Sequence, residues 1–413
     1  MARLRSKTDL LTAAADSGDM FVGEAAPANP IVGQRWFRLS SSVVYQYTSD
    51  GATSFWLDIS SDGIGTSASR SVDIVANSDP HLETNPAGGV GTVYYNREGN
   101  RYFVCTDATS NANVWSGRYV GSGGVETTYK SGSDFFKVHS FLKTGTHTFY
   151  LEAAQTIDYL VVGGGGGGGI GLANGNAAGG GAGGLLTATG YSLAAGNHVI
   201  TVGAGGVYSN SANGGNSSIG AIFVARGGGH GGGYPASNYP PGSGNGTVGS
   251  GGGQGQGADG TSTVGVPTTG QGNAGSPYAG PGSYGAGGGV GAGGVGKEAT
   301  LDTNRSRGGA GGEAVTNSLR TGSAVYYAGG GAGSTHDQYN NAGYGGNNST
   351  VANRGGGGNG KHNQAAGPTR IAESGKANTG GGGGGGQGGS NAAAGDSGWG
   401  GSGIVVIRYQ INP

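Results

Sequence analysis

The chain has 413 residues, of which only 11% are charged, and a formal net charge of −1. This balance provides no basic face for nucleic acid or anionic lipid, and no stretch reaches the roughly 18 consecutive apolar residues of a membrane span. We therefore expect neither a nucleic-acid partner nor membrane insertion. The single cysteine, Cys105, excludes intrachain disulfides and zinc-finger spacings.

Glycine is distributed unevenly along the chain. Only 16 of the 101 glycines lie in residues 1–162, and 85 lie in the remaining 251 residues. Glycine loses more backbone entropy on folding than any other residue, and it buries no side chain in return. We infer a boundary near residue 160, beyond which hydrophobic burial alone cannot hold the chain together.

The first 130 residues contain an internal near-repeat. Each copy has an aromatic pair, a short alternating run, a polar turn and then a tryptophan, which is Trp56 in the first copy and Trp115 in the second. This pattern predicts two small antiparallel β modules over residues 26–62 and 86–124. Each module is too short to bury much core alone, and this small size favours an elongated oligomer in which modules stack or associate with other chains. Residues 1–25 form a separate N-terminal segment.

A third strand-rich part spans residues 125–162. Residues 135–142 and 147–151, joined by a Lys-Thr-Gly-Thr turn, predict a hairpin. Apolar runs continue within 185–225 and return at 403–413. The run Ile404 to Tyr409 has the character of Tyr159 to Val162, so we expect both in one sheet of a β platform. Residues 163–402 are then a long excursion that leaves this platform and returns to it.

Glycine islands recur along the excursion, between segments rich in Tyr, Asn, Ser, Ala and Thr. The polyproline II helix, with three residues per turn, has no internal hydrogen bonds, so its N–H and C=O groups can bond to parallel neighbours if glycine lets the backbones approach. We therefore predict a polyglycine II array and a mainly β protein. The islands are 163–169, 179–184, 203–206, 227–233, 249–257, 285–294, 308–312, 329–333, 355–358, 380–386 and 398–403.

Three other readings of the glycine-rich part are less favourable. Disorder is the usual state of Gly/Ser-rich tracts, but these islands are punctuated by bulky residues and end in a good strand. Collagen requires glycine at every third position with abundant proline, whereas the islands are continuous and the chain has 12 prolines. Calcium-binding β-rolls require a nonapeptide series that is absent.

Matches to catalytic motifs are expected by chance in a chain so rich in glycine. Residues 291–297 and 355–361 fit GxxxxGK, but Glu298 and His362 follow where a phosphate loop needs Ser or Thr. The GDSG sequence at 395–398 has no protease context, and the histidines lack metal-binding spacing. We expect a protein that is not an enzyme and that has no cofactor and no metal.

The chain resembles bacteriophage tail-fibre proteins with glycine-rich domains. The residues that carry the likeness are 33–37 with 45–47 and 55–60, 136–141 with 145–149, 159–162 with the following glycines, 199–206, and 400–409. It is also similar to the tip adhesins of T-even-type phages, in which a polyglycine II array displays variable loops. The amino-terminal modules depart from those adhesins, which leaves a trimer and a monomeric tip as alternatives.

The resemblance implies a virion component that recognises a bacterial surface. Residues 1–25 would attach it to phage tail or baseplate proteins, and the glycine-rich domain would bind a host outer-surface protein or polysaccharide. It also implies a homotrimer, located on the virion tail fibre and therefore extracellular. The first 20 residues lack an apolar core of signal-peptide length, so we expect synthesis in the host cytoplasm without a signal peptide.

Candidate receptor contacts lie between the islands. Rigid aromatic side chains with Asn and Gly resemble the composition of an antibody paratope, and loops on a rigid scaffold commonly carry binding residues. For each tyrosine the alternative is a role in capping the end of the array. The candidates are Tyr234, Tyr239, Tyr278, Tyr284, Tyr326, Tyr327, His336, Tyr339, Tyr344 and His362.

Two other functions remain open from the sequence. The chain could be a purely structural glycine-rich fibre or decoration protein that spans distance while another protein touches the host. Ice binding is a third class, because some antifreeze proteins have glycine-rich polyproline II arrays. Bulky Tyr and Arg residues interrupt the regular period that such proteins usually show.

Overall fold

The computed structural model describes the chain as two compact units, residues Met1–Arg118 and Tyr119–Pro413. All regular elements in the described part are β-strands, so the protein is mainly β, as predicted. The described residues are 20–23, 25–30, 34–38, 43–49, 54–58, 72–98, 101–117, 120–171, 175–207, 212–234, 248–256, 265–277, 285–302, 305–335, 355–361, 372–387 and 397–411.

The first unit contains two four-stranded sheets with the same topology. In each sheet the strands follow in chain order, the first pair is parallel and the others are antiparallel. The first sheet contains β1 (Met20–Gly23), β2 (Arg35–Arg38), β3 (Val43–Ser49) and β4 (Ser54–Asp58), and the second contains β5 (Ile74–Ala76), β6 (Val93–Asn96), β7 (Arg101–Asp107) and β8 (Val114–Gly117).

The aromatic cores of the two modules have matching geometry. The rings of Trp36 and Trp56 meet edge to face at 5.7 Å and 66°, and those of Tyr94 and Trp115 do so at 5.5 Å and 65°. The two sheets thus share one arrangement of strands and aromatic rings. The sequence analysis expected antiparallel modules over 26–62 and 86–124. Each sheet instead begins with a short strand, β1 or β5, that pairs in parallel with the next strand and has no alternation signal in the sequence.

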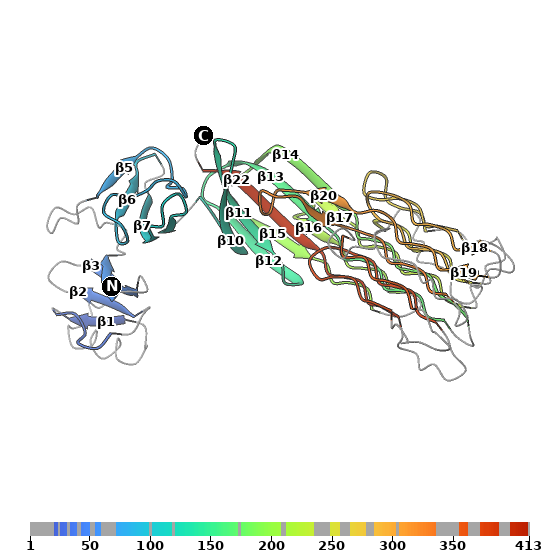
Figure 1. Ribbon diagram of the computed structural model, residues 1–413. Helices are drawn as coiled ribbons and strands as arrows, with labels where there is room; N and C mark the ends of the chain where they lie inside the picture. The colour runs from blue at the N-terminus through green and yellow to red at the C-terminus, as the bar shows by residue number, and fades with distance from the viewer. Residues whose placement is uncertain are drawn as a thin grey trace, which may run out of the picture. The chain divides into compact units, whose positions relative to one another are not determined.

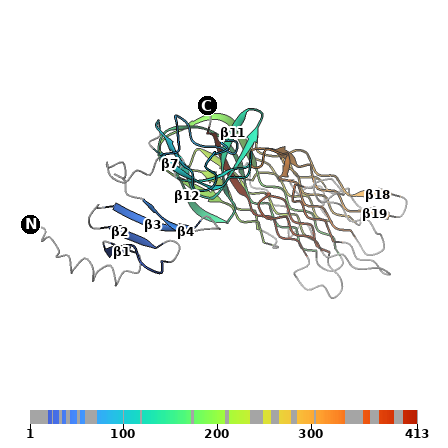
Figure 2. The same ribbon diagram turned by 60° about the vertical axis from the view of Figure 1, so that its left-hand side comes forward.

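The second unit begins with two five-stranded sheets that pack face to face as a sandwich (Figures 1 and 2). We call them the central sheet and the lateral sheet. The central sheet has the order β10 (Val125–Ser131), β11 (Asp134–Phe141), β22 (Ile404–Gln410), β13 (Gln155–Val162) and β14 (Leu185–Leu193), and the lateral sheet has the order β17 (Phe223–Ala225), β16 (Ser217–Ile219), β15 (Gly196–Val202), β12 (Gly145–Leu151) and β9 (Gly121–Ser122).

The predicted pairing of Tyr159–Val162 with the final strand is confirmed, because β13 and β22 are antiparallel neighbours with Val162 opposite Ile404. The predicted hairpin is wrong. β11 and β12 follow one another but lie in different sheets, where β11 pairs with β10 and β22, and β12 pairs with β15. The chain crosses between sheets because Phe141 and Phe149 both face the space between them, with ring centroids 6.3 Å apart.

The central sheet is covered on both faces. One face packs on the lateral sheet, as in the contact of His139 with Phe149 at 4.9 Å. On the other face, Leu160 and Val406 pack with Leu319 and Tyr327 from the base of the array. Burial on both sides explains the continuous apolar runs Tyr159–Val162 in β13 and Ile404–Ile407 in β22.

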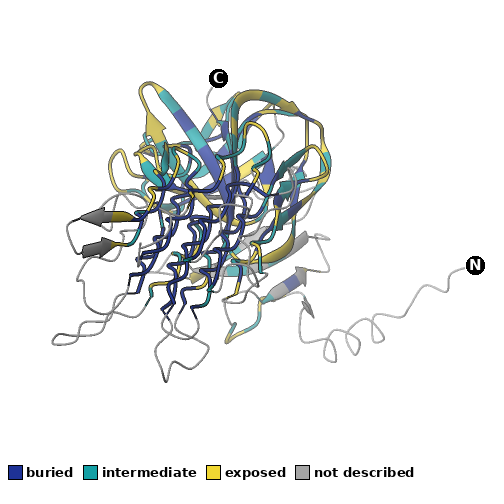
Figure 3. Ribbon diagram, turned by 90° about the vertical axis from the view of Figure 1, so that its right-hand side faces the viewer, coloured by how far each residue is buried: buried dark blue, intermediate teal, exposed yellow. Residues whose placement is uncertain are grey.

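Two short hairpins lie within the glycine-rich part, at β18 (Thr300–Asp302) with β19 (Arg305–Arg307), and at β20 (Val315–Asn317) with β21 (Val325–Tyr327). Elsewhere the glycine islands form extended runs that continue from the sandwich strands (Figure 1). Figure 3 shows these runs almost wholly buried. Their backbones, which have almost no side chains, must therefore supply the packing.

The run 163–169 shows how the array is held. All seven of its N–H groups donate to carbonyls of other runs, at N···O distances of 2.8–3.4 Å. Residues 163, 166 and 169 donate to 184, 181 and 178, residues 164 and 167 to 215 and 212, and residues 165 and 168 to 401 and 398. Each set of partners recurs every third residue, which is the period of a polyproline II helix.

Carbonyl groups of the same run bond to three further neighbours. Gly164 and Gly167 accept from residues 228 and 231, Gly165 from residue 206, and Gly166 and Gly169 from residues 383 and 386. The run is thus surrounded by six others. A Cβ atom at any of its seven residues would lie 2.0–2.3 Å from a backbone oxygen of a neighbour, so this run requires glycine, and the predicted array is confirmed.

Candidate functional site

The runs of the array alternate in direction, so the segments that join them fall at two ends. The proximal end is where residues 163 and 184 meet at the sandwich strands, and the distal end is where 169 meets 178. Any exposed surface formed by the joining segments is therefore gathered at one of these two ends.

Backbone hydrogen bonds connect several runs at the distal end. Tyr234 donates its N–H to Ile170 O at 3.1 Å, and Gly386 donates to Gly169 O at 3.1 Å. Lys361 donates to Gly385 O at 2.9 Å, and Thr335 donates to Lys361 O at 3.2 Å. Gly285 pairs in turn with Thr335. These bonds hold the starting points of several connecting segments in one fixed arrangement.

Polar side chains close the distal end. Asn176 Nδ2 donates to Gln256 Oε1 at 2.9 Å, and the backbone of Asn176 both donates to that oxygen and accepts the N–H of Gln256. Ser334 Oγ lies 3.0 Å and 2.8 Å from the carbonyl oxygens of Ala177 and Gly386 and accepts the N–H of Ala177. We call Asn176, Gln256 and Ser334 the polar layer.

The sequence analysis did not single out the polar layer. The sequence does contain a pattern that could have identified it, since each member is a hydrogen-bonding residue at the end of a glycine-rich run. Such residues are also common in exposed loops, so their burial could not be read from composition. Asn176 and Ser334 are fully buried, and their role is to replace the lateral backbone bonds where the glycine runs end.

Tyr234 is the candidate contact residue that the structure describes at the distal end. It is half-buried and ends the run 226–234. A Cβ atom at Gly175 would lie 2.0 Å from its ring, so the ring packs directly on the Gly175 backbone. This geometry fixes the ring at the edge of the distal end, where part of it stays accessible.

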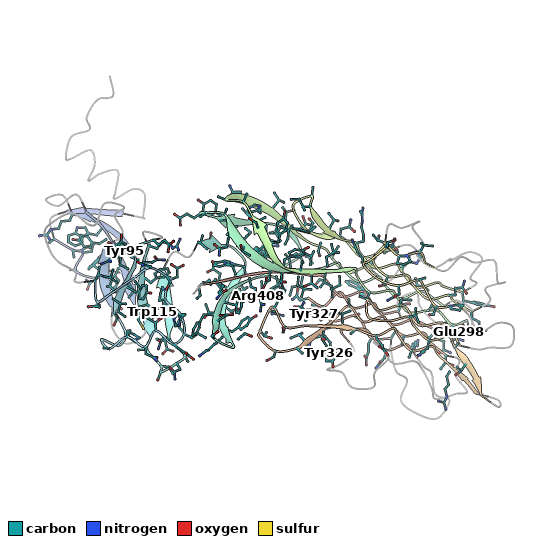
Figure 4. The ribbon with its side chains drawn as sticks, turned by 90° about the horizontal axis from the view of Figure 1, so that it is seen from above. Tyr95, Trp115, Glu298, Tyr326, Tyr327 and Arg408 are labelled. Atoms are coloured by element: carbon teal, nitrogen blue, oxygen red, sulfur yellow. The ribbon has the colours of Figure 1, made fainter. Side chains whose placement is uncertain are left out.

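Tyr326 and Tyr327 lie at the proximal end. Both belong to β21, beside the sandwich, as Figure 4 shows, with Glu298 far along the array. Tyr327 is fully buried in the core formed with Leu160 and Val406. Burial raises the pKa of its hydroxyl, an effect that Arg320 opposes. Tyr327 is therefore not exposed for contact with a receptor, because the apolar β21 sequence packs on the central sheet.

Seven candidates lie outside the described residues, namely Tyr239, Tyr278, Tyr284, His336, Tyr339, Tyr344 and His362. Their segments in the chain are 235–247, 278–284, 336–354 and 362–371. Each segment adjoins a described residue at the distal end, which is Tyr234, Gly285, Thr335 or Lys361 respectively. The described residues that flank these segments thus lie together at the distal end.

Chemical groups that could support catalysis are sparse in the described array. His230 is buried, which lowers its pKa, and its Nδ1 lies 3.1 Å from Gly231 O. No group of three or more His, Cys, Asp or Glu residues suited to a metal ion occurs in the described ranges. The same ranges contain no helix with the length and apolar character needed to cross a membrane.

Residues of the segments that match catalytic motifs form hydrogen bonds between runs of the array. In the two GxxxxGK segments, Lys297 and Lys361 donate their backbone N–H groups to carbonyls of neighbouring runs, at 2.8 Å to Ala310 and 2.9 Å to Gly385. Ser397 of the GDSG segment donates its hydroxyl to Gly169 O at 2.5 Å. These groups act as lateral bonds between runs.

A shallow groove of about 450 Å³ lies at the proximal end. Its lining combines the apolar residues Leu185, Leu186, Ala292 and Val315 with Thr187, Gln271 and two glycines. The Gln271 side chain at its edge already accepts the N–H of Arg226 and donates to Val224 O, both at 2.8 Å. The groove therefore offers few polar groups to orient a ligand.

Comparison with known proteins gives one family. A search of curated proteins finds no match. A family model described as "Glycine-rich domain" matches residues 142–410. This span covers most of the sandwich and the whole array, from the end of β11 to the end of β22. The chain therefore belongs to the glycine-rich domain family.

Proposed function

We propose that this protein is a bacteriophage tail-fibre adhesin that binds a host bacterial surface through the connecting segments at the distal end of its array. The observation that carries the proposal is the way the array is built. Its runs are held by backbone bonds between glycine-rich segments that do not use the side chains of the connecting segments, so those segments can vary in sequence without disturbing the scaffold. Variable contact segments on a rigid support are what recognition of changing receptors requires.

The composition of those segments supports a binding role. Segments 235–247, 278–284, 336–354 and 362–371 contain seven of the ten tyrosines and histidines proposed as contacts, together with many Asn, Ser and Gly residues. Aromatic rings provide a large contact area at a low cost in conformational entropy, and small polar residues provide adaptable hydrogen bonds. The partner would be an outer-surface protein or a polysaccharide.

The remaining parts of the proposal concern assembly. Residues 1–25 would attach the protein to phage tail or baseplate proteins, and the strand Met20–Gly23 within them already belongs to the first sheet. The protein would act without catalysis or a cofactor, as a homotrimer on the virion surface. It would be made in the host cytoplasm and become extracellular with the virion.

Competition for phage adsorption tests the proposal. Purified protein at saturating concentration should reduce adsorption of the phage that encodes it to its host. Replacing Tyr239, Tyr278 and Tyr284 together by Ser should weaken this competition at least about tenfold, because aromatic anchors commonly dominate binding energy. Tyr326→Ser, at the proximal end, is the matched control and should compete like the unchanged protein.

Unchanged adsorption at saturating wild-type protein would contradict the adhesin proposal. A second candidate is a structural fibre, which the dense lateral bonding of the array favours, since it makes a stiff spacer. That function predicts that the triple Ser variant, assembled into virions, leaves host range and adsorption rate unchanged.

A further inference from the structure

Trp399 differs from the other tryptophans of the chain. Of the four tryptophans, Trp36, Trp56 and Trp115 lie in the first unit, where their rings pack against aromatic neighbours. Trp399 lies in the run 398–403 of the array, and its side chain is 51% exposed. The lateral bonds of this run come from backbone groups, so its packing does not require an indole. Exposed aromatic side chains of this size commonly mark a contact surface.

The backbone of Trp399 is held by the two runs beside it. On one side, Trp399 donates its N–H to Ser374 Oγ at 3.1 Å and accepts the N–H of Gly375 at 2.7 Å. On the other side, Gly400 donates its N–H to Gly206 O at 2.8 Å. The indole is therefore attached to a fixed point on the flank of the array, which lowers the entropy lost when a ligand binds to it.

Small polar groups and one apolar side chain surround the indole. Val207, on the adjacent run, is 47% exposed, and Ser374 is exposed on the opposite side. Ser402 follows Trp399 by three residues, which is one turn of a polyproline II helix. Its hydroxyl accepts the N–H of Asn378 at 2.9 Å and donates to Asn378 Oδ1 at 3.4 Å. We call Val207, Ser374, Asn378, Trp399 and Ser402 the indole strip.

We propose that the indole strip binds a pyranose ring of a bacterial surface polysaccharide. An indole has a flat apolar face, which matches the face of a pyranose that presents C–H groups. Hydroxyl and amide groups both donate and accept hydrogen bonds, as sugar hydroxyls do. Trp399 supplies the first of these features, and Ser374, Ser402 and Asn378 supply the second. The proposal rests on the proposed function for the source of the polysaccharide, and it adds a contact on the flank of the array.

The strip fits a saccharide chain better than a protein partner. Its large apolar side chains are those of Trp399 and Val207, whereas a standard protein interface has roughly 20 residues on each side and several buried anchors. A sugar ring needs only one apolar face and a few well-placed polar groups. Ser402 lies about 9 Å along the run from Trp399, so consecutive sugar units can contact the same strip.

Calorimetry of the full chain with polysaccharide extracted from the surface of the host bacterium tests the proposal. Wild-type protein should bind it, and Trp399→Ala should weaken binding at least about tenfold, because the aromatic ring provides most of the contact area. Val295→Ala is the matched control, since Val295 is an apolar side chain of the array that is 58% exposed. It should bind like wild type.

Tryptophan fluorescence gives a second readout on the same indole. The difference in iodide quenching between wild-type protein and Trp399→Phe isolates Trp399 from the three tryptophans of the first unit. Because bound polysaccharide covers the ring, it should reduce this difference. The phenylalanine keeps an aromatic face, so Trp399→Phe should bind the polysaccharide more tightly than Trp399→Ala.

The outcomes separate this proposal from the adhesin proposal. Protein that competes for phage adsorption but binds no polysaccharide would overturn the saccharide site and leave the adhesin proposal standing. Polysaccharide binding that depends on Trp399, without competition for adsorption, would support the saccharide site and contradict the adhesin proposal. Equal binding by wild type and Trp399→Ala, or quenching of Trp399 that polysaccharide leaves unchanged, would overturn the saccharide site. Loss of Trp399-dependent binding to host cells after protease treatment, with no binding of polysaccharide, would assign a protein partner to the strip instead.

Discussion

The sandwich and the array solve the problem of stability in opposite ways. In the sandwich, large side chains such as Leu160 and Phe149 are fully buried between layers, and burial of apolar area supplies the free energy. In the array, the run 163–169 buries only backbone, and each amide is bonded to a neighbour. The sandwich is therefore sensitive to the loss of buried side chains, whereas the run 163–169 is sensitive to any added side chain.

The largest expected effect comes from adding one methyl group inside the array. A Cβ atom at Gly166 would lie 2.2 Å from Gly229 O, and a backbone held on six sides cannot move away. We expect Gly166→Ala to lower the free energy of unfolding of the second unit by more than about 4 kcal/mol, measured by chemical denaturation.

Gly294→Ala is the matched control, because its nearest neighbour would be Glu313 Cβ at 3.4 Å, an ordinary contact. It should change stability by less than about 0.5 kcal/mol. Equal destabilisation by the two substitutions would show that backbone crowding does not limit the array.

Removing a side chain from the sandwich should have the next largest effect. Leu160 is fully buried within the core that joins the central sheet to the array, so Leu160→Ala should cost about 3 kcal/mol through lost burial and a cavity. Val125→Ala, at an exposed site, should cost less than about 0.5 kcal/mol. A small effect of Leu160→Ala on thermal unfolding would contradict the side-chain account of the sandwich.

Acid should destabilise the sandwich through His139. Burial lowers its pKa from 6.5 to about 4, and Lys137 acts in the same direction, while Gly123 O and Glu126 oppose the shift. Because the folded pKa lies below the unfolded value, the neutral histidine contributes its full stability above about pH 6.5, and this contribution is lost as the pH falls toward 4. The expected loss is about 2–3 kcal/mol.

The measurement is the midpoint of urea unfolding between pH 7 and pH 4. His139→Gln should flatten most of the dependence between pH 6.5 and 4. A smaller part should remain, because burial also lowers the pKa of His230. An identical pH profile for the variant and the unchanged protein would rule out His139 as the cause.

The smallest predicted effect concerns the polar layer. Ser334→Ala removes a hydroxyl that contacts two carbonyls and one N–H, so it should cost about 1–2 kcal/mol. Ser192→Ala, at an exposed position of β14, should have almost no effect. Thermal unfolding of the two variants measures the difference, and equal midpoints would show that the polar layer does not stabilise the distal end.

The sequence could predict what depends on local pattern. Continuous glycine runs have no side chains to bury, so the sequence predicted that bonds between neighbouring backbones hold them in place. The matched apolar runs at 159–162 and 404–409 predicted that the two segments lie in one sheet. The predicted hairpin between β11 and β12 failed because a turn and two apolar strands look the same whether the strands pair or cross between sheets. That choice depends on the long-range partner β22, which lies more than 250 residues away in the chain.

The candidate site was less predictable for a related reason. Composition identifies a tyrosine as a potential contact, but it does not show whether that tyrosine lies at the distal end of the array or at the proximal end beside the sandwich. Tyr234 and Tyr327 have similar glycine-rich surroundings in the sequence, yet the first lies at the distal end and the second is buried at the proximal end. Only the alternating direction of the runs, set by their hydrogen-bond partners, separates them.

Amide hydrogen exchange of residues 163–169 tests the central claim most directly. Because all seven N–H groups donate to neighbouring runs and are buried, we expect protection similar to that of Tyr159–Val162 in β13, measured on the full chain under native conditions. Exchange of these glycines at the rate of an unstructured peptide, while β13 stays protected, would contradict the account of a backbone-bonded array.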